Sequence, residues 1–354
     1  MKNRHTINIL TSKERYYIPL LKVWFDDLCK KLNSKIYFID NINEKDIDAI
    51  NNSFAIFIYV DCPINIFQRI HTKIILYQDF PLTKNDVNFV DEIKKYKKKI
   101  LFLTHKIYKK FLKNSVEFGN FFPPVKREKQ IKKDIDLLIL YGEPKVKFTL
   151  NNIFLILIAK NLINFYGDFI NKIEKNFLYN FLLSFSFKNK YEKLNFIYRY
   201  IKLLRRRFII SEVEKIGDKL KIYYYGSNRY FPKNIKYKAR FLGNKNFYNI
   251  IRRTKVIIAT TPLVCDTIDE RIYHTLKFNC LPIFESYPQN IPLLKNKNNA
   301  LCFVYKKDVI KNKIINLIKN KSLTNSLLNR TIKNINQLKK INPKKYLIEK
   351  LNAI

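Results

Sequence analysis

The chain has 354 residues, of which 47% are hydrophobic, and it carries a formal net charge of +39 at pH 7. This length allows two domains with proper cores, and the apolar content excludes a chain dominated by disorder. The charge invites polyanions such as nucleic acid or an anionic membrane, although most of the lysines are expected on an ordinary solvated surface.

Short strands and helical segments alternate in the first third of the chain. The strand-like runs are "TINIL" (6–10), "KIYFI" (35–39), "FAIFIYV" (54–60), "KIILYQ" (73–78) and "KILFLTH" (99–105). Residues 17–32, between the first two runs, have helical periodicity. This alternation predicts right-handed crossovers, a mostly parallel sheet and a first Rossmann-like α/β domain over residues 1–122.

A linker and a second α/β domain are predicted to follow. The stretch "FFPPVKREKQIKKD" combines two prolines with a charge run and has no apolar period, which suits a linker over 123–133. The strand "DIDLLILYG" then begins at Asp134 and opens a domain over 134–325. Because its acidic pair lies in or next to a strand, "DID" is not interpreted as a metal motif.

The second domain is predicted to contain a helical insertion and further alternating elements. Residues 148–208 are rich in large apolar side chains at helical spacing and form the insertion. Strands are expected in 219–226, 239–243, 255–262, 280–285 and 300–305, with a helix over 244–254. Basic helices with a break at Pro343 follow, and those in 326–354 are candidates to pack back on the first domain.

The segment from Val264 to Glu285 predicts a loop, a helix and a strand. Thr267 and Glu270 have the spacing of a capping box, so the helix is expected to begin near Ile268. Ile268, Ile272, Tyr273 and Leu276 fall on one helical face, and Asn279 stands where a left-handed cap is needed. The helix would therefore open at the carboxyl end of a parallel sheet, where such sheets bind ligands.

A helix N-terminus in that position suits an anion such as a diphosphate. Glu270 is a candidate to bind sugar or ribose hydroxyls and Arg271 to pair with phosphate, while Asp266 and Asp269 lie at the helix entry. The alternative is that Glu270 only caps its helix and Arg271 only pairs with it.

The run "DERIYHTLKFNCLPIFE" (269–285) resembles the nucleotide-sugar-binding segment of GT-B glycosyltransferases, with similar patterns in CgeB-like, group 1 and exostosin-like proteins. The resemblance is clearest over Lys221–Tyr305. It implies two Rossmann-like domains facing each other across a cleft, with the donor mainly on the second. The implied reaction moves a sugar, without a metal, from a nucleotide-sugar donor to a glycan or lipid-linked glycan in surface polysaccharide assembly.

Two positions depart from that family pattern. Many relatives have a second glutamate where this chain has His274, and a glycine where it has Asn279. His274 either donates to a diphosphate or ribose or is a partly buried histidine, and its presence keeps open a non-catalytic GT-B-like binding protein. The candidate donor-binding residues are Glu270, Arg271, His274, Asp266, Thr267, Asp269, Tyr273, Gly226, Ser227, Lys145 and Lys147.

The remaining candidates each have a simpler alternative. Lys145 and Lys147 could reach phosphate or be solvated, and Gly226 with Ser227 could approach the base or ribose or form a plain turn. In the first domain the loops with Ser12–Arg15, Asp61 and Asp79 follow strands. Asp61 or Asp79 is a candidate catalytic base for an inverting transfer, or else a cap or turn residue.

Location and partners follow from the remaining patterns. The five cysteines lack metal-ligand spacing, and no apolar run has the length of a signal peptide or membrane span, so we expect a cytoplasmic protein without a bound metal or cofactor. Residues 187–208 interleave aromatic and basic side chains, which suits either the inner face of the plasma membrane or a packed helix. A nucleic-acid-binding protein remains the alternative from charge, although no recognised nucleic-acid motif is present.

Overall fold

The computed structural model describes residues 6–17, 19–59, 62–77, 92–93, 95–96, 98–104, 115–117, 125–129, 131–141, 146, 149–166, 169–186, 188, 190–226, 233–235, 237–239, 244–260, 270–285, 301–337 and 342–354. The chain divides into two compact units. The first is Met1–Pro123 with Lys339–Ile354, and the second is Pro124–Leu338.

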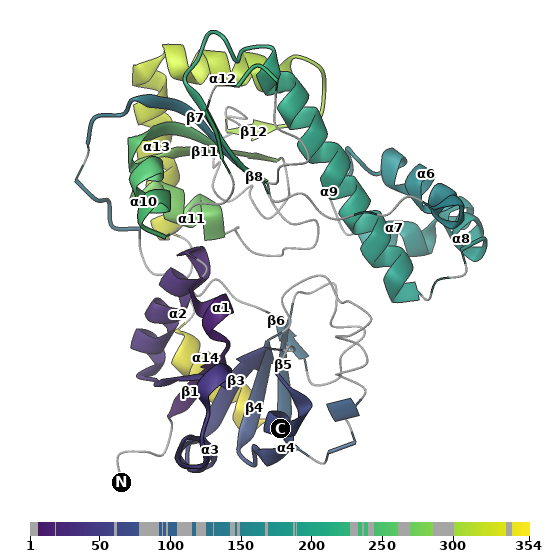
Figure 1. The fold of residues 1–354 in the computed structure, drawn as a ribbon, viewed down its shortest axis with the longest axis vertical. Helices are drawn as coiled ribbons and strands as arrows, with labels where there is room; N and C mark the ends of the chain where they lie inside the picture. The colour runs from purple at the N-terminus through teal and green to yellow at the C-terminus, as the bar shows by residue number, and fades with distance from the viewer. Residues whose placement is uncertain are drawn as a thin grey trace. The chain divides into compact units, whose positions relative to one another are not determined.

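The first unit is a parallel sheet with helices on both faces (Figure 1). Its strands are β1 (Ile7–Thr11), β2 (Ile36–Phe38), β3 (Ala55–Tyr59), β4 (Lys73–Tyr77), β5 (Ile100–Thr104) and β6 (Ser115–Glu117). They lie in the order β2-β1-β3-β4-β5-β6, and every neighbouring pair is parallel. The helices of this unit are α1 (Lys13–Tyr16), α2 (Pro19–Leu32), α3 (Glu44–Asn51), α4 (Ile64–Arg69) and α14 (Pro343–Asn352).

Alternation along the strands of the first unit fills two separate cores. In β3, Ala55 and Phe57 lie in a cluster with side chains of α2 and α14, whereas Ile56 and Ile58 lie in a cluster with side chains of α3 and α4. Successive side chains of a strand point to opposite faces, so an uninterrupted apolar run is what a sheet covered on both sides requires. The predicted α/β class is thereby confirmed for this unit.

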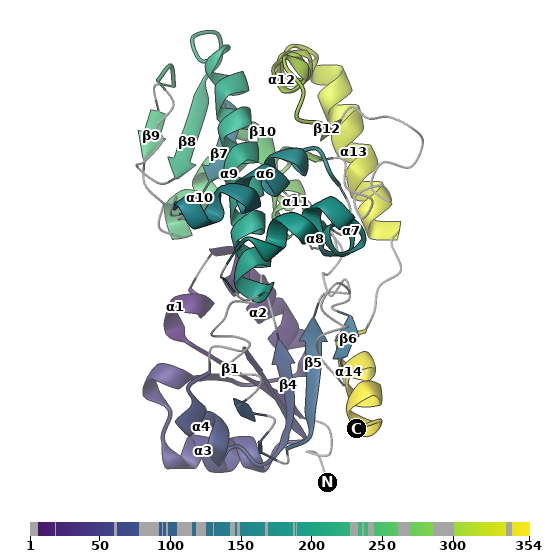
Figure 2. The same cartoon turned by 90° about the vertical axis from the view of Figure 1, so that its right-hand side faces the viewer.

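Helix α14 returns to the first unit from the other end of the chain. Figures 1 and 2 show this yellow helix beside the sheet, and it packs against the purple α2. Leu347 and Leu351 are fully buried there, and the Lys73 ammonium donates to the carbonyl oxygen of Leu351 at 3.0 Å. Residues 326–337 belong instead to the second unit.

The second unit repeats the parallel architecture. Its strands are β7 (Ile135–Tyr141), β8 (Ile222–Gly226), β9 (Tyr237–Ala239), β10 (Thr254–Ala259), β11 (Leu281–Glu285) and β12 (Cys302–Phe303). They lie in the order β12-β11-β10-β7-β8-β9, again with every neighbouring pair parallel. Helices α10 (Asn244–Arg253), α11 (Glu270–Lys277), α12 (Val309–Lys319) and α13 (Lys321–Gln337) pack against this sheet or against one another.

The predicted insertion is a group of helices between β7 and β8. It contains α6 (Ile153–Asn161), α7 (Phe169–Lys175), α8 (Phe177–Ser184) and the long α9 (Lys190–Glu214). Figure 1 shows α9 running from the sheet of the second unit out to α6, α7 and α8. Within the described ranges, no helix combines the length and the apolar character needed to cross a membrane.

Helix α9 covers most of residues 187–208, for which the sequence suits either a membrane-facing helix or a packed helix. Its aromatic residues Phe196, Tyr198 and Tyr200 are buried, so these rings pack inside the protein. The packed-helix alternative therefore describes α9.

The connection from α11 to β11 depends on a left-handed residue, as the sequence predicts. Asn279 has φ 58°, and the N–H of Cys280 donates to the carbonyl oxygen of Thr275 at 3.0 Å, which closes the helix end. The Asn279 side-chain amide also donates to the carbonyl oxygen of Glu128 at 2.9 Å, and the N–H of Glu128 donates to the carbonyl oxygen of Lys277 at 3.0 Å. Asn279 thus adopts the left-handed conformation that the sequence predicts here and also binds the chain that leads into β7.

Replacing Asn279 tests both contributions. We expect Asn279→Ala to be the less stable variant, because alanine is strained in the left-handed region by about 1–2 kcal/mol and loses the bond to Glu128, which is worth about 1 kcal/mol. Asn279→Gly should lose only the second contribution. Urea unfolding followed by circular dichroism measures the order, and equal stability of the two variants would contradict a backbone role for this residue.

Candidate functional site

The carboxyl ends of the strands of the second sheet meet at one edge. Tyr141 ends β7, Gly226 ends β8, Ala259 ends β10 and Glu285 ends β11. Parallel pairing of neighbouring strands gives all four ends the same direction. Open parallel α/β sheets bind their ligands outside this edge, which makes it the candidate site.

Gly226 is required at this edge by the approach of two strands. A Cβ atom at this position would lie 2.2 Å from the carbonyl oxygen of Tyr141 and 2.6 Å from the Tyr224 hydroxyl. Strand pairing therefore explains this glycine without a ligand. A contact between Gly226 and the donor stays a prediction, and Ser227 lies outside the described residues.

Helix α9 brings a buried arginine to the same edge. Arg205 is 2% exposed, and its Nε and Nη2 donate to the carbonyl oxygens of Ile163 and Phe165, each at 2.8 Å. The guanidinium carbon lies 5.2 Å from the ring centroid of Tyr166 and 5.1 Å from that of Tyr305. Carbonyl oxygens and aromatic faces both favour a cation, so they offset part of the large cost of removing this charge from water.

A buried carboxylate lies close to this arginine. Glu285 is 1% exposed, and its Oε1 accepts a hydrogen bond of 2.5 Å from the hydroxyl of Tyr305. Burial, followed by the neighbouring Glu285 charge, holds the pKa of Tyr305 well above its ordinary value of 10. Tyr305 therefore stays protonated around neutral pH and donates its hydroxyl hydrogen to Glu285.

A second buried arginine completes the group. The Arg206 guanidinium carbon lies 5.3 Å from the ring centroid of Tyr141, at the end of β7. We call the group the edge cluster, and its members are Tyr141, Tyr166, Arg205, Arg206, Glu285 and Tyr305. Two guanidinium groups stand there against one carboxylate, so the local potential beneath this edge favours an anionic ligand. The sequence predicts Glu285 at the end of a strand, and Arg205 and Arg206 only as two of the basic side chains in residues 187–208.

Helix α11 follows β10 in the chain, as the motif predicts. Its described part runs from Glu270 to Lys277, and its buried face contains Ile272 and Leu276 as expected. The predicted start near Ile268 lies outside the described residues. The backbone positions of Glu270, Arg271, Tyr273 and His274 on this helix are described, whereas their side chains are not. Their predicted roles toward a donor stay predictions.

Several predicted site residues fall outside the described part of the chain. In the second unit these are Lys145, Lys147, Asp266, Thr267 and Asp269. In the first unit they are Asp61 and Asp79, which follow the last residues of β3 and β4 by two positions in sequence. Their roles also stay predictions.

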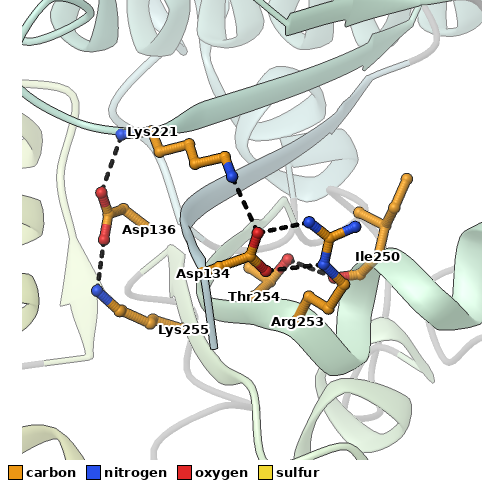
Figure 3. Close-up of polar contacts among 7 residues, drawn as sticks. All are labelled: Asp134, Asp136, Lys221, Ile250, Arg253, Thr254 and Lys255. Atoms are coloured by element: carbon orange, nitrogen blue, oxygen red, sulfur yellow. Dashed lines mark hydrogen bonds and ion pairs between the residues drawn. The ribbon is translucent and has the colours of Figure 1, made fainter. Parts of the chain in front are cut away.

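The acidic pair of "DID" lies at the opposite, amino-terminal edge of the second sheet and is occupied by basic partners (Figure 3). Asp134 binds Arg253 through two oxygens at 2.7 and 2.5 Å and Lys221 at 2.9 Å. Asp136 accepts from the Lys221 N–H at 2.9 Å and pairs with Lys255 at 2.6 Å. In the part of the chain that the structure describes, no group of three or more His, Cys, Asp or Glu side chains could hold a metal ion. The pair thus ties together the starts of β7, β8 and β10.

Removing the Asp134 charge should weaken the second unit in a pH-dependent manner. The hydrogen bonds from Arg253 and Lys221 hold the pKa of Asp134 well below its ordinary value of 3.8. A lowered folded-state pKa stabilises the fold above the unfolded pKa, and the contribution is lost as the pH falls through the folded value.

We therefore expect Asp134→Asn to lower the stability by about 1 kcal/mol at pH 7, with a smaller difference from the wild type at pH 3. Thermal melts of both proteins between pH 3 and 7 measure this. A pH-independent difference would show that the ion pairs do not carry the effect.

The bond between Tyr305 and Glu285 should be a coupled, buried interaction. Tyr305→Phe removes one donor from a buried carboxylate and should cost about 1–3 kcal/mol. In a Glu285→Gln background the acceptor is uncharged, so the same change should cost clearly less. A double-mutant cycle by chemical denaturation measures the coupling, and identical costs in the two backgrounds would contradict the pairing.

Comparison with known proteins finds similar folds but no matching sequence. No family model and no curated protein sequence matches the chain. A structure of T4 phage BGT in complex with UDP and Mn2+ aligns over 98% of this chain and 97% of that chain, with a TM-score of 0.52 and 11% identity. An alpha-glucosyltransferase (AGT) in complex with UDP aligns over 98% and 99%, with a TM-score of 0.52 and 9% identity.

T4 phage beta-glucosyltransferase gives a further match over 98% of this chain and 97% of that chain, with a TM-score of 0.51 and 9% identity. At these identities the likeness concerns the fold. With its two parallel α/β sheets matched over nearly the whole length of these glucosyltransferases, the chain has the GT-B fold.

Proposed function

We propose that the protein is a glycosyltransferase that takes its sugar from a nucleotide-sugar donor. The observation that carries the proposal is the alignment of both α/β units, over 98% of the chain, with glucosyltransferases whose structures contain UDP. Because fold alone does not fix function, the proposal also depends on the chemistry of the second sheet's carboxyl edge.

The charges at this edge suit a diphosphate. Helix α11 follows β10, so its N-terminus is oriented to offset negative charge, and the buried pair Arg205 and Arg206 adds positive potential without touching the ligand. Within the proposal Arg271 pairs with phosphate and Glu270 accepts hydrogen bonds from ribose or sugar hydroxyls. His274 either donates to the same donor or packs partly buried.

The reaction requires a base and a stabilised leaving group. In the inverting form, Asp61 or Asp79 of the first unit takes the proton of the acceptor hydroxyl while its oxygen attacks the anomeric carbon. The bond from that carbon to the phosphate oxygen breaks, and the electron pair leaves with the nucleotide. Positive groups around the departing phosphate lower the barrier because negative charge develops there.

The acceptor belongs to one of two classes. The resemblance of 269–285 supports a glycan or lipid-linked glycan in surface polysaccharide assembly, whereas the net charge of +39 supports a polyanion such as nucleic acid. Transfer of radiolabelled sugar to each class distinguishes them. A protein that binds donor but transfers to neither, and does not hydrolyse it, would be the non-catalytic relative.

Donor binding is the direct test of the proposal. We expect isothermal calorimetry to show binding of UDP or of another nucleoside diphosphate with its sugar, and Glu270→Ala to weaken that binding by about tenfold or more, because it removes hydrogen bonds to a charged group. Glu349→Ala, on α14 of the first unit, is the matched control and should bind as the wild type does. Failure of UDP-, GDP-, ADP- and CMP-sugars to bind would refute the donor assignment.

The sugar-transfer assay also tests whether the reaction requires a metal ion. The sequence predicts metal-independent transfer, while the T4 phage BGT structure contains Mn2+. Turnover that persists in EDTA would support independence, and turnover restored only by Mn2+ would overturn it.

A further inference from the structure

The helical insertion exposes an unusual amount of apolar surface. Among the described residues, ten large hydrophobic side chains are exposed, and seven of them lie between residues 150 and 185. These seven, which we call the insertion patch, are Leu150, Ile153, Leu157, Phe177, Leu178, Phe181 and Phe185. Leu150 is 87% and Phe177 is 86% exposed, so they are almost as accessible as in an unfolded chain. Contiguous exposed apolar surface marks an interaction site more often than scattered single residues do.

The patch is one surface rather than two. Leu150 lies in the short 3-10 helix η3 (Leu150–Asn152) that leads into α6, and it recurs with Ile153 and Leu157 of α6 every three or four residues. Phe177, Phe181 and Phe185 recur in the same way along α8 and its end. The two helices pack together, and the ring of Phe185 lies 4.9 Å from that of Phe154 and 4.9 Å from that of Phe181. The aromatic contacts therefore join the two exposed rows.

The two helices carry few polar side chains beside the patch, and those exposed are Lys160 and Asn161 of α6 and Asn180 and Ser184 of α8. Helix α8 has no charged residue, and the opposite side of α6 is filled by Leu155, Ile158 and Ala159, which are buried. Both helices are thus apolar around most of their circumference. Helices that are apolar around most of their circumference are usually covered by further protein or by lipid.

The charges around the patch are mostly positive. Residues 149–193 contain six lysines and three acidic residues, and Lys160, Lys172, Lys175 and Lys190 are exposed. Glu174 is paired with Lys190 at 2.9 Å, which leaves the other exposed lysines to dominate the rim. An apolar centre with a basic rim is complementary to a surface that has an anionic outer layer over an apolar interior.

We infer that the insertion patch docks on an anionic lipid bilayer, with Phe177 and Leu178 entering the headgroup region and the surrounding lysines binding the lipid charges. A second copy of the chain would bring one lysine rim against another. Nucleic acid would use the lysines and stack bases on the phenylalanines, but it would gain little from the four aliphatic side chains Leu150, Ile153, Leu157 and Leu178. The inference is independent of the donor site, because none of these residues belongs to the carboxyl edge.

Vesicle flotation with the full chain tests the docking. We expect binding to vesicles of phosphatidylcholine with a quarter phosphatidylglycerol, and much weaker binding to pure phosphatidylcholine. The double variant Phe177→Ser with Leu178→Ser should reduce the partition coefficient by about tenfold or more, because the two apolar side chains that would enter the bilayer are lost. Lys172→Gln with Lys175→Gln should reduce it by a similar factor on anionic vesicles only.

Matched controls separate the outcomes. Ile131→Ser removes an exposed apolar residue outside the patch and should leave partitioning unchanged, and all variants should keep the wild-type melting temperature and donor affinity. Equal partitioning of wild type and the Phe177 variant would overturn the inference. A dimer seen by light scattering that the Phe177 variant dissociates would also overturn it, because the patch would then bind a second copy of the chain. A Phe177 variant that loses only DNA binding would overturn it as well.

Discussion

Parallel strand pairing is the constraint on which the rest of this molecule depends. A parallel neighbour cannot be reached by a tight turn, so the chain must return along the sheet after every strand, and helices come to cover both faces. The same pairing collects the carboxyl ends of β7, β8, β10 and β11 at one edge of the second sheet. The amino edge is then free for structural ion pairs such as that of Asp134 with Arg253. One geometric rule thus separates the half of the sheet that can bind a ligand from the half that holds the strands together.

Charge is used differently at those two edges. At the amino edge, half-exposed carboxylates pair with half-exposed cations, which contributes modestly to stability and is tolerant of change. At the carboxyl edge, Arg205 and Glu285 are removed from water, where each needs hydrogen bonds or aromatic faces to persist. Such a buried group is costly as a stabilising device, and its presence beside the candidate ligand position fits a role in setting the local potential.

The sequence predicts the elements better than it predicts their partners. Most of the strands, helix α11 with its buried Ile272 and Leu276, and the left-handed Asn279 follow from periodicity and local backbone preference, which are properties of neighbouring residues. Strand β6 does not follow from them. The edge cluster could not be predicted in the same way, because Tyr141, Arg205 and Glu285 come together only through tertiary packing. A signal was nevertheless present. Arg205 lies in register with Ile201 and Ile209 on the buried stripe of α9, and an arginine on an apolar stripe indicates a buried charge.

The membrane interpretation shows a related difference. The hypothesis came from the aromatic and basic residues of 187–208, yet Phe196, Tyr198 and Tyr200 are buried there, while the insertion patch lies in the helices before α9. The two stretches also differ in composition, because α9 is rich in lysine and arginine whereas α8 has no charged residue. Only the packing shows which of their apolar side chains are exposed.

The return of α14 to the first unit has a consequence for how the protein is made. Leu347 and Leu351 belong to the same core as Ile7 and Ile9. The core around β1 therefore stays incomplete until a helix more than 300 residues later in the chain has been synthesised. The second unit, by contrast, is a single uninterrupted segment and can close its core before that helix exists. Biogenesis should therefore run against the order of the chain, with the first sheet completed last and its apolar face dependent on chaperones until then.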